Sequence, residues 1–316
     1  MADHHPLFGS QTDPAGDSGY PADHPPRKGF FTDTSICIGC KACEVACKQW
    51  NGIPDDGFDL LGMSYDNTGE LGASTWRHVK FVERTGGRSS DDPPTASAFG
   101  PSSSTERSPV VDLGMPGMGP SGADSGRSPE FRWLMSSDVC KHCTHAGCLD
   151  VCPTGALFRT EFGTVVVQPD ICNGCGYCVS GCPYGVIERR EGDGRAWKCT
   201  LCYDRLKDGQ EPACAHACPT KSIQFGDLDE LRSRAAARVA ALHEQGVTEA
   251  RLYGEDPDDG VGGNGAFFLL LDEPEVYGFP PDPVVPARDI RRMWTFAGMA
   301  AAALAAVASA VFGGRP

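Results

Sequence analysis

Residues 140–182 read CKHCTHAGCLDVCPTGALFRTEFGTVVVQPDICNGCGYCVSGC and hold eight cysteines in two groups of four. The first group is spaced C-x2-C-x4-C-x3-C, the second C-x2-C-x2-C-x3-C, and a proline follows each group. The second spacing is typical of bacterial two-cluster iron–sulfur proteins, in which the fourth cysteine of the run ligates the other cluster. The stretch therefore predicts neighbouring iron–sulfur clusters. Its cysteines are Cys140, Cys143, Cys148, Cys152, Cys172, Cys175, Cys178 and Cys182.

Two further groups of four flank this centre, and together the four groups account for all 16 cysteines. The N-terminal group repeats C-x2-C-x2-C-x3-C but is followed by Lys48 instead of proline. The C-terminal group is spaced C-x2-C-x11-C-x3-C and ends in Cys-Pro, which makes the internal repeat visible. The flanking cysteines are Cys37, Cys40, Cys43 and Cys47, and Cys199, Cys202, Cys214 and Cys218.

This pattern favours iron–sulfur clusters over the two other common uses of cysteine. A [4Fe–4S] cluster needs four thiolates, and a C-x2-C-x2-C loop can place three of them around one cluster. Zinc sites use two C-x2-C pairs, which gives no reason for triplets followed by a distant Cys-Pro. A disulfide scaffold does not require the same close spacing four times over. We therefore expect four [4Fe–4S] clusters.

No arrangement of residues predicts catalysis by this chain. No nucleophile with a base, phosphate-binding loop or pair of carboxylates stands out, so we expect the chain to conduct electrons without catalytic residues of its own. His142 and His145 flank Cys143, but four cysteines are already present for each cluster. We expect both histidines beside the clusters or at the surface, where they could tune potentials only.

Composition limits the remaining possibilities. Of the 316 residues, 40% are hydrophobic, while 39 are glycine and 25 proline, so the chain is rich in loops and its fold should depend on bound metal. The net charge of −14 argues against nucleic acid as a partner. Residues 1–28 lack an apolar run, and residues 86–130 are rich in Ser, Pro and Gly. We expect a disordered tail and a disordered insertion there.

Local patterns predict a few regular elements between the cysteines. The clearest is an amphipathic helix over residues 227–245, with Asp227 capping its start and Gly246 ending it. We also expect a short helix over 44–50 and strands over 75–84, 163–168 and 265–271.

The C-terminus differs from the rest of the chain. Met293–Gly314 is a run of 22 residues without a charge, and about 20 apolar residues span a bilayer. Gly298, Ala302 and Ala306 provide a face of small residues for packing against another membrane helix. A soluble Ala-rich helix is the alternative. We predict a single membrane anchor over residues 291–316.

The whole pattern resembles the beta (iron–sulfur) subunit of membrane-bound respiratory formate dehydrogenase, a four-cluster subunit of the molybdopterin oxidoreductase family. The likeness covers about residues 30–312, apart from the insertion. It rests on the order of the four groups and on these segments: Lys41–Cys47, Tyr65–Asn67, Ser74–Trp76, Cys172–Cys178, Lys198–Cys202, Gly209–Cys214, Leu252–Tyr253 and Val261–Gly263.

The resemblance implies an α+β fold with two ferredoxin-like halves, each holding two [4Fe–4S] clusters. The first half would comprise residues 29–85 and 190–226, and the second residues 131–189. Residues 227–290 would add a helix, a strand and a linker before the anchor at 291–316.

The resemblance also implies how the sixteen cysteines are shared among four clusters. Each cluster would take three ligands from one group and a fourth from another. The four sets would be Cys37, Cys40, Cys43 and Cys218; Cys47, Cys199, Cys202 and Cys214; Cys140, Cys143, Cys148 and Cys182; and Cys152, Cys172, Cys175 and Cys178.

Two partners and a location follow from the same resemblance. A molybdopterin-containing alpha subunit with molybdenum or tungsten would oxidise formate, and a haem b membrane gamma subunit would pass the electrons to quinone. Three arginines precede the apolar run and one follows it, which by the positive-inside rule places the cluster domain in the cytoplasm. The family instead has it outside, and we expect the extracytoplasmic face.

Three alternatives stay open from the sequence. The chain could serve another molybdopterin oxidoreductase or a membrane hydrogenase, which the partner's metal would distinguish. A structural zinc-binding interaction module is the alternative from a different class, and such a protein would be colourless.

Overall fold

The computed structural model describes residues 25–56, 65–66, 68–84, 132–287 and 290–312, together with the two paired dipeptide strands β1 (His4–His5) and β2 (Gly9–Ser10). The expected insertion at 86–130 and most of the expected tail at 1–28 lie outside the described residues. The chain divides into two compact units, Met1–Val82 with Leu134–Pro316, and Glu83–Trp133. All the sites below lie in the first unit.

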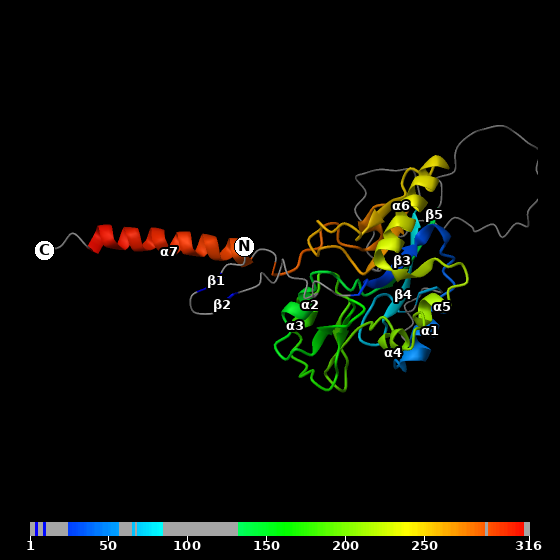
Figure 1. The fold of residues 1–316 in the computed structure, drawn as a ribbon, viewed down its shortest axis with the longest axis horizontal. Coiled ribbons are helices and arrows are strands. Elements are labelled where there is room, and N and C mark those ends of the chain that lie inside the picture. Colours follow the sequence, from blue (N-terminus) through cyan, green and yellow to red (C-terminus); the bar gives the residue numbers. More distant parts are fainter. Residues whose placement is uncertain are drawn as a thin grey trace, which may run out of the picture. The chain divides into compact units, whose positions relative to one another are not determined.

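A four-stranded sheet is the largest sheet among the described residues (Figure 1). Its strands run in the order β10 (Ile223–Asp227), β3 (Lys28–Asp33), β12 (Ala266–Leu270) and β11 (Arg251–Tyr253). β3 pairs antiparallel with β10 and parallel with β12, and β11 pairs antiparallel with β12. The predicted strand over 265–271 is confirmed as β12.

Every residue of β12 is buried because the sheet is covered on both faces. Phe267 and Leu269 point to one face, where they pack with helix α6 (Leu228–Glu244). Phe268 and Leu270 point to the opposite face and join a core that also contains cysteines. This alternation follows from the two-residue period of a strand. The sheet thus separates an ordinary hydrophobic core from the cysteine-rich one.

Helix α6 confirms the predicted amphipathic helix, with Leu231, Ala235 and Leu242 buried along one face. It ends before Gly246, whose φ of 87° is in the left-handed region that favours glycine. Asp227 is the N-cap residue, as predicted, but its carboxylate makes no capping hydrogen bond to the helix. Instead it forms an ion pair of 2.6 Å with Lys28 on the neighbouring strand, so the sheet pairing takes precedence over the local cap.

The folded part begins before the expected boundary at residue 29. β3 starts at Lys28, and Arg27 Nη1 donates a hydrogen bond of 2.7 Å to Thr144 Oγ1. The arginine therefore ties the first strand to the loop of the central cysteines.

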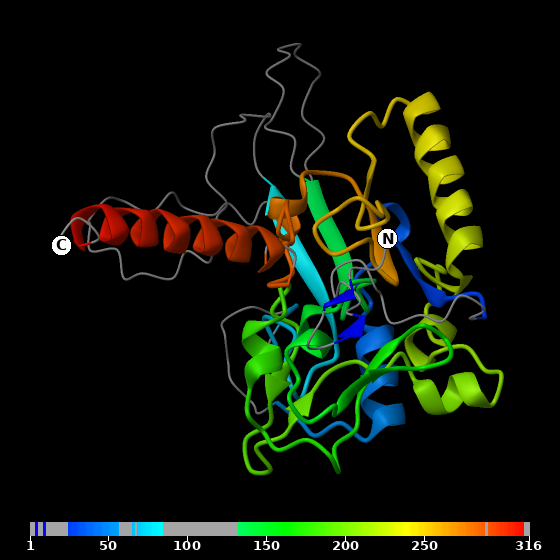
Figure 2. The same ribbon diagram turned by 60° about the vertical axis from the view of Figure 1, so that its left-hand side comes forward.

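Two long strands, β4 (Arg77–Arg84) and β5 (Arg132–Val139), form a separate two-stranded sheet, which Figure 2 shows side by side. β4 is the strand predicted over 75–84. The two strands carry buried polar side chains, among them Arg77, Ser137 and Asp138.

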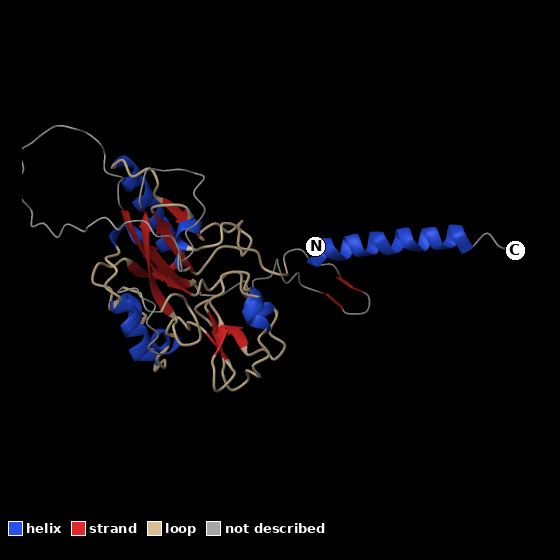
Figure 3. Cartoon of the chain, turned by 180° about the vertical axis from the view of Figure 1, so that it is seen from behind, coloured by secondary structure: helices blue, strands red, loops and turns tan. Residues whose placement is uncertain are grey.

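The elements that carry cysteines are short and joined by loops (Figure 3). Helix α1 (Ala42–Asn51) packs against α5 (Ala213–His216), and α2 (Gly147–Asp150) packs against α3 (Tyr177–Ser180). The other elements here are η1 (Thr34–Ile36), α4 (Tyr203–Lys207), and the hairpins β6 (Leu157–Arg159) with β7 (Val165–Val167) and β8 (Glu188–Arg189) with β9 (Ala196–Trp197). The predicted short helix is confirmed as α1 and the predicted strand over 163–168 as β7, so the α+β class is confirmed.

The C-terminal part of the chain contains η2 (Pro274–Tyr277) and the 23-residue helix α7 (Ile290–Phe312). Within the described part of the chain, α7 is the one helix long and apolar enough to cross a membrane, over Arg292–Val311. None of that span is buried.

Candidate cluster sites

Four short helices each carry or precede two cysteines that lie one turn apart. Cys43 and Cys47 lie on α1, and Cys214 lies on α5 with Cys218 just after it. Residues four apart on a helix point to the same side. Each helix can therefore give one thiol to each of two neighbouring sites. The same spacing recurs around α2, with Cys148 and Cys152, and around α3, with Cys178 and Cys182.

Site 1 is a hollow lined by four thiols from two distant parts of the chain. The loop after η1 bends at Gly39, whose φ is 64°, and a side chain there would meet Phe81 Cε1 at 2.6 Å. Ser137 and Val79 also line the hollow. Of its thiols, Cys40 is exposed to solvent. The four are Cys37, Cys40, Cys43 and Cys218.

Site 2 lies next to site 1 and is wholly interior. Its thiols are close enough to interact electrostatically, and all four are buried. Asn51 Nδ2 lies 3.8 Å from the sulfurs of Cys47 and Cys202, and the Leu201 N–H donates to Cys199 Sγ at 3.3 Å. The site comprises Cys47, Cys199, Cys202 and Cys214.

Site 3 is a second hollow, formed from the central stretch of the sequence. Besides its thiols, it is lined by Lys141, His142, Tyr184 and Lys198. The four cysteines are Cys140, Cys143, Cys148 and Cys182.

Site 4 shares helices α2 and α3 with site 3. The thiols of Cys152, Cys172 and Cys175 all interact electrostatically with that of Cys178. The Ala196 N–H donates to Cys172 Sγ at 3.4 Å, and Cys175 is exposed to solvent. These four cysteines complete the sixteen.

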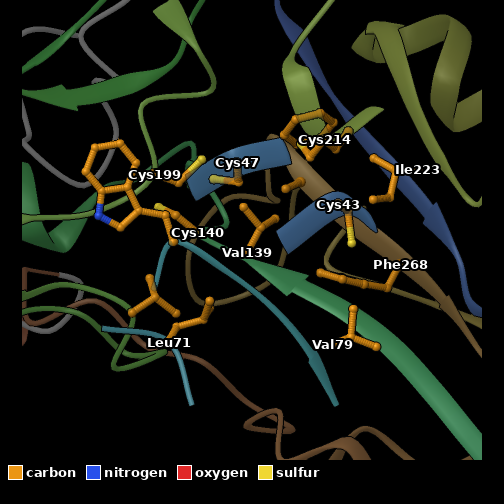
Figure 4. Close-up of a cluster of buried hydrophobic side chains, with 14 of the residues drawn as sticks. Cys43, Cys47, Leu71, Val79, Val139, Cys140, Cys199, Cys214, Ile223 and Phe268 are labelled. Atoms are coloured by element: carbon orange, nitrogen blue, oxygen red, sulfur yellow. The ribbon is translucent and has the colours of Figure 1, made fainter. Parts of the chain in front are cut away.

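The four sites form a continuous series. Sites 1 and 2 share α1 and α5, and sites 3 and 4 share α2 and α3 in the same way. Cys199 of site 2 interacts electrostatically with Cys140 of site 3, which joins the two pairs. Figure 4 shows Cys47, Cys199 and Cys140 gathered in one part of the buried core, with Cys43 farther along. The exposed cysteines, Cys40 and Cys175, belong to the first and last sites.

Burial raises the pKa of several thiols, so without metal these thiols are protonated. It raises the pKa of Cys43 and Cys148 to about 12 and the pKa of Cys202 to about 11, and it raises the pKa of Cys47 strongly. Neutral thiols are tolerated in a core that four buried thiolates would disrupt. Iron must therefore displace these protons when it binds.

The arrangement of donors suits clusters better than single metal ions. At sites 1 and 3 the four thiols surround a hollow. This geometry does not favour the zinc alternative.

The two histidines near Cys143 are held by the protein. His142 is 2% exposed, and its Nδ1 accepts a hydrogen bond of 3.1 Å from the Val165 N–H. Burial and the cation of Lys198 hold the pKa of His142 well below its usual range, so the ring is neutral. His145 is half-buried and packs against Gly262. The side chain of His142 lines site 3 beside Cys143.

Three cations lie buried near the sites, and their burial could not readily be predicted from the sequence. Arg77, Lys141 and Lys198 are each 1–2% exposed. Lys141 forms an ion pair with Asp138 and lies over the ring of Phe279, 4.5 Å from its centroid. Lys198 directly precedes Cys199, which is the one signal that could have drawn attention to it. Arg77 stands in an ordinary strand pattern.

Two family profiles match the chain, and both describe a 4Fe-4S dicluster domain. One covers residues 36–156 and the other residues 131–228, and together they include all 16 cysteines. With the sites above, they define this chain as an iron–sulfur electron-transfer protein.

Curated relatives identify the family. The formate dehydrogenase iron-sulfur subunit of Haemophilus influenzae is 36% identical over 296 residues, covering 90% of this chain and 80% of the relative. The iron-sulfur subunit of the nitrate-inducible formate dehydrogenase of Escherichia coli is 36% identical over 267 residues, covering 83% and 76%. The B subunit of anaerobic dimethyl sulfoxide reductase from Escherichia coli is 31% identical over 226 residues, covering 71% and 86%. The chain belongs to the family of formate dehydrogenase iron–sulfur subunits.

Proposed function

We propose that each of the four sites holds one [4Fe–4S] cluster and that the chain carries electrons along the series from end to end. The observation that carries this proposal is the sharing of four short helices, each with cysteines in two adjacent sites. When bound, a cluster takes up and releases an electron without bond chemistry by the protein. The chain's own residues supply the thiolates, donate N–H groups to sulfur, and exclude water from site 2, whose thiols are all buried.

We further propose that the electrons come from a catalytic subunit that oxidises formate at molybdenum or tungsten. The names of the relatives from Haemophilus influenzae and Escherichia coli support this donor. The exposed Cys40 and Cys175, at opposite ends of the series, leave an entry and an exit near the surface. The acceptor would be a haem b membrane subunit that reduces quinone, and α7 would hold the chain beside it.

The formate donor can be tested in the complex purified anaerobically from detergent-solubilised membranes through a tag on this chain. Formate should bleach the brown absorbance of the oxidised clusters, because electrons then enter the series. Acetate, which the same site cannot oxidise, is the matched control and should leave the colour unchanged.

The outcomes of this experiment separate the parts of the proposal. Brown protein that ignores formate but bleaches with dithionite would keep the clusters and refute formate as donor. A colourless preparation that retains metal would refute the clusters themselves.

A second molybdopterin enzyme is the alternative partner. The B subunit of dimethyl sulfoxide reductase is also similar over most of its length, which favours this alternative over others. In that case electrons would pass along the four sites to a reductase. Dimethyl sulfoxide would then reoxidise the dithionite-reduced clusters, and formate would not reduce the oxidised ones.

We also propose that the cluster domain faces the extracytoplasmic side, as in the family that the sequence resembles. Protease added to intact spheroplasts should then digest the domain, while a cytoplasmic marker protein survives. Digestion only after the spheroplasts are lysed would place the domain in the cytoplasm.

A further inference from the structure

Arg77 is a buried cation with no acidic partner among the described residues. Its side chain is fully buried at 1% exposure, and its guanidinium lies 4.9 Å from the centroid of the Phe30 ring. Nη1 donates to the backbone oxygen of Ser137 at 3.1 Å and to Ser137 Oγ at 3.0 Å. Nε and Nη2 have no hydrogen-bond partner in the described part of the chain. An unpaired buried charge is strongly unfavourable, so this side chain requires an anion that the described residues do not supply.

The surroundings of Arg77 show where that anion belongs. Ser137 Oγ lies 3.2 Å from Cys43 Sγ of site 1. Because the hydroxyl oxygen accepts from Arg77, its proton is free to point at the sulfur. Arg77 also lies close enough to Cys47, Cys199 and Cys214 of site 2 for thiolates there to stabilise its charge. Arg77 therefore lies at the junction of sites 1 and 2.

Lys198 occupies the equivalent position at the next junction. Its Nζ donates to the backbone oxygens of Val165 and Cys199, the latter at 3.0 Å. Its side chain also lines the hollow of site 3 with Cys140 and Cys148, so thiolates at sites 2 and 3 would stabilise its charge. The third buried cation, Lys141, differs because Asp138 already neutralises it.

We propose that Arg77 and Lys198 are positioning residues that hold up the reduction potentials of the clusters on either side of them, Arg77 at sites 1 and 2 and Lys198 at sites 2 and 3. This inference rests on the proposed function, since it requires clusters at these sites. A [4Fe–4S] cluster with four thiolates is an anion, and reduction adds one more negative charge. A cation shared by two such sites favours the reduced form of both and weakens their mutual repulsion in a medium of low dielectric constant.

The test is a potentiometric titration of the full-length protein, followed by electron paramagnetic resonance and resolved into one-electron steps. In Arg77→Met, which removes the charge but keeps a long apolar side chain, the equilibrium constant for reduction should fall at least tenfold at two clusters, about 59 mV each. The other two clusters are internal controls and should not change. Lys198→Met should likewise shift two clusters, only one of which is shared with Arg77→Met.

Two further variants distinguish an effect of the charge of Arg77 from an effect of the substitution on the structure. Arg77→Lys keeps the charge, so its reduction potentials should be close to those of the wild-type protein. Ser137→Ala keeps Arg77 but removes the hydroxyl near Cys43, so it should lower the potential of one cluster alone. Iron and sulfide content should match the wild-type protein in all variants.

Several results would overturn the inference. Potentials unchanged in assembled Arg77→Met and Lys198→Met, or an equal shift at all four clusters, would refute it while the proposed function stands. If Arg77→Met and Arg77→Gln both fail to take up iron while Arg77→Lys takes it up normally, the charge is required for cluster assembly. That result would refute a role in setting the reduction potentials. Wild-type protein without iron and sulfide would refute the proposed function itself.

Discussion

Removing the iron from this protein with a chelator is expected to unfold the region of sites 3 and 4, between Cys140 and Cys199. The regular elements there are very short: α2 and α3 have 4 residues each, and β8 and β9 have 2 each. Isolated helices shorter than about 12 residues are marginal in water, so these elements need another source of stability. The cysteines themselves form part of the buried contacts in this region.

The free energies of metal binding and of folding predict a large effect of iron removal. Structural metal sites contribute on the order of 10–16 kcal/mol, as measured for zinc, whereas a whole domain is stable by about 5–15 kcal/mol. The sheet and α6 should behave differently, because Phe31, Phe267, Leu231 and Leu242 form a core without cysteine. We therefore expect partial unfolding, with residues 140–199 lost first.

Limited proteolysis with mass spectrometry measures this directly. After chelation, cleavage should concentrate within residues 140–199, while the fragments containing α6 and its sheet persist. The matched control is the same chelator saturated with iron beforehand. Protein stripped of iron and sulfide that keeps its original cleavage pattern would contradict the prediction.

Deleting residues 290–316 is expected to move the protein from the membrane to the soluble fraction. Helix α7 has 23 residues, about 35 Å at the helical rise, against about 30 Å for the bilayer core. Its large apolar side chains are exposed, including Trp294 at 74% and Leu304 at 71%. In water such a surface is unfavourable, and lipid would cover it.

Fractionation after an alkaline carbonate wash tests the anchor, because the wash removes proteins bound only through partners. The control variant lacks residues 313–316 alone and keeps the helix, so it should remain in the membrane. If the chain without residues 290–316 also resists the wash, α7 is not the anchor.

Features that depend on local spacing could be predicted from the amino-acid order. Sixteen cysteines in four groups, each closing with C-x3-C, predict the kind of cofactor, because three near ligands and one distant ligand suit a cluster and not a single ion. The apolar face of α6, the continuous apolar run of β12 and the charge-free run of α7 are likewise periodic or compositional signals. Those elements were predicted within a few residues.

Features that depend on contacts between distant residues emerge only from the folded chain. Cys218 joins a hollow with Cys37 because β3 and β10 pair across the sheet and bring the two loops together. For the same reason, the carboxylate of Asp227 forms an ion pair with Lys28 and does not cap its own helix. Arg77 gives no local signal, since an arginine in a strand is ordinarily exposed. Its burial between two sites follows from the packing of β4 against the cysteine core. There, anionic clusters at the two sites would compensate the guanidinium for its loss of contact with water.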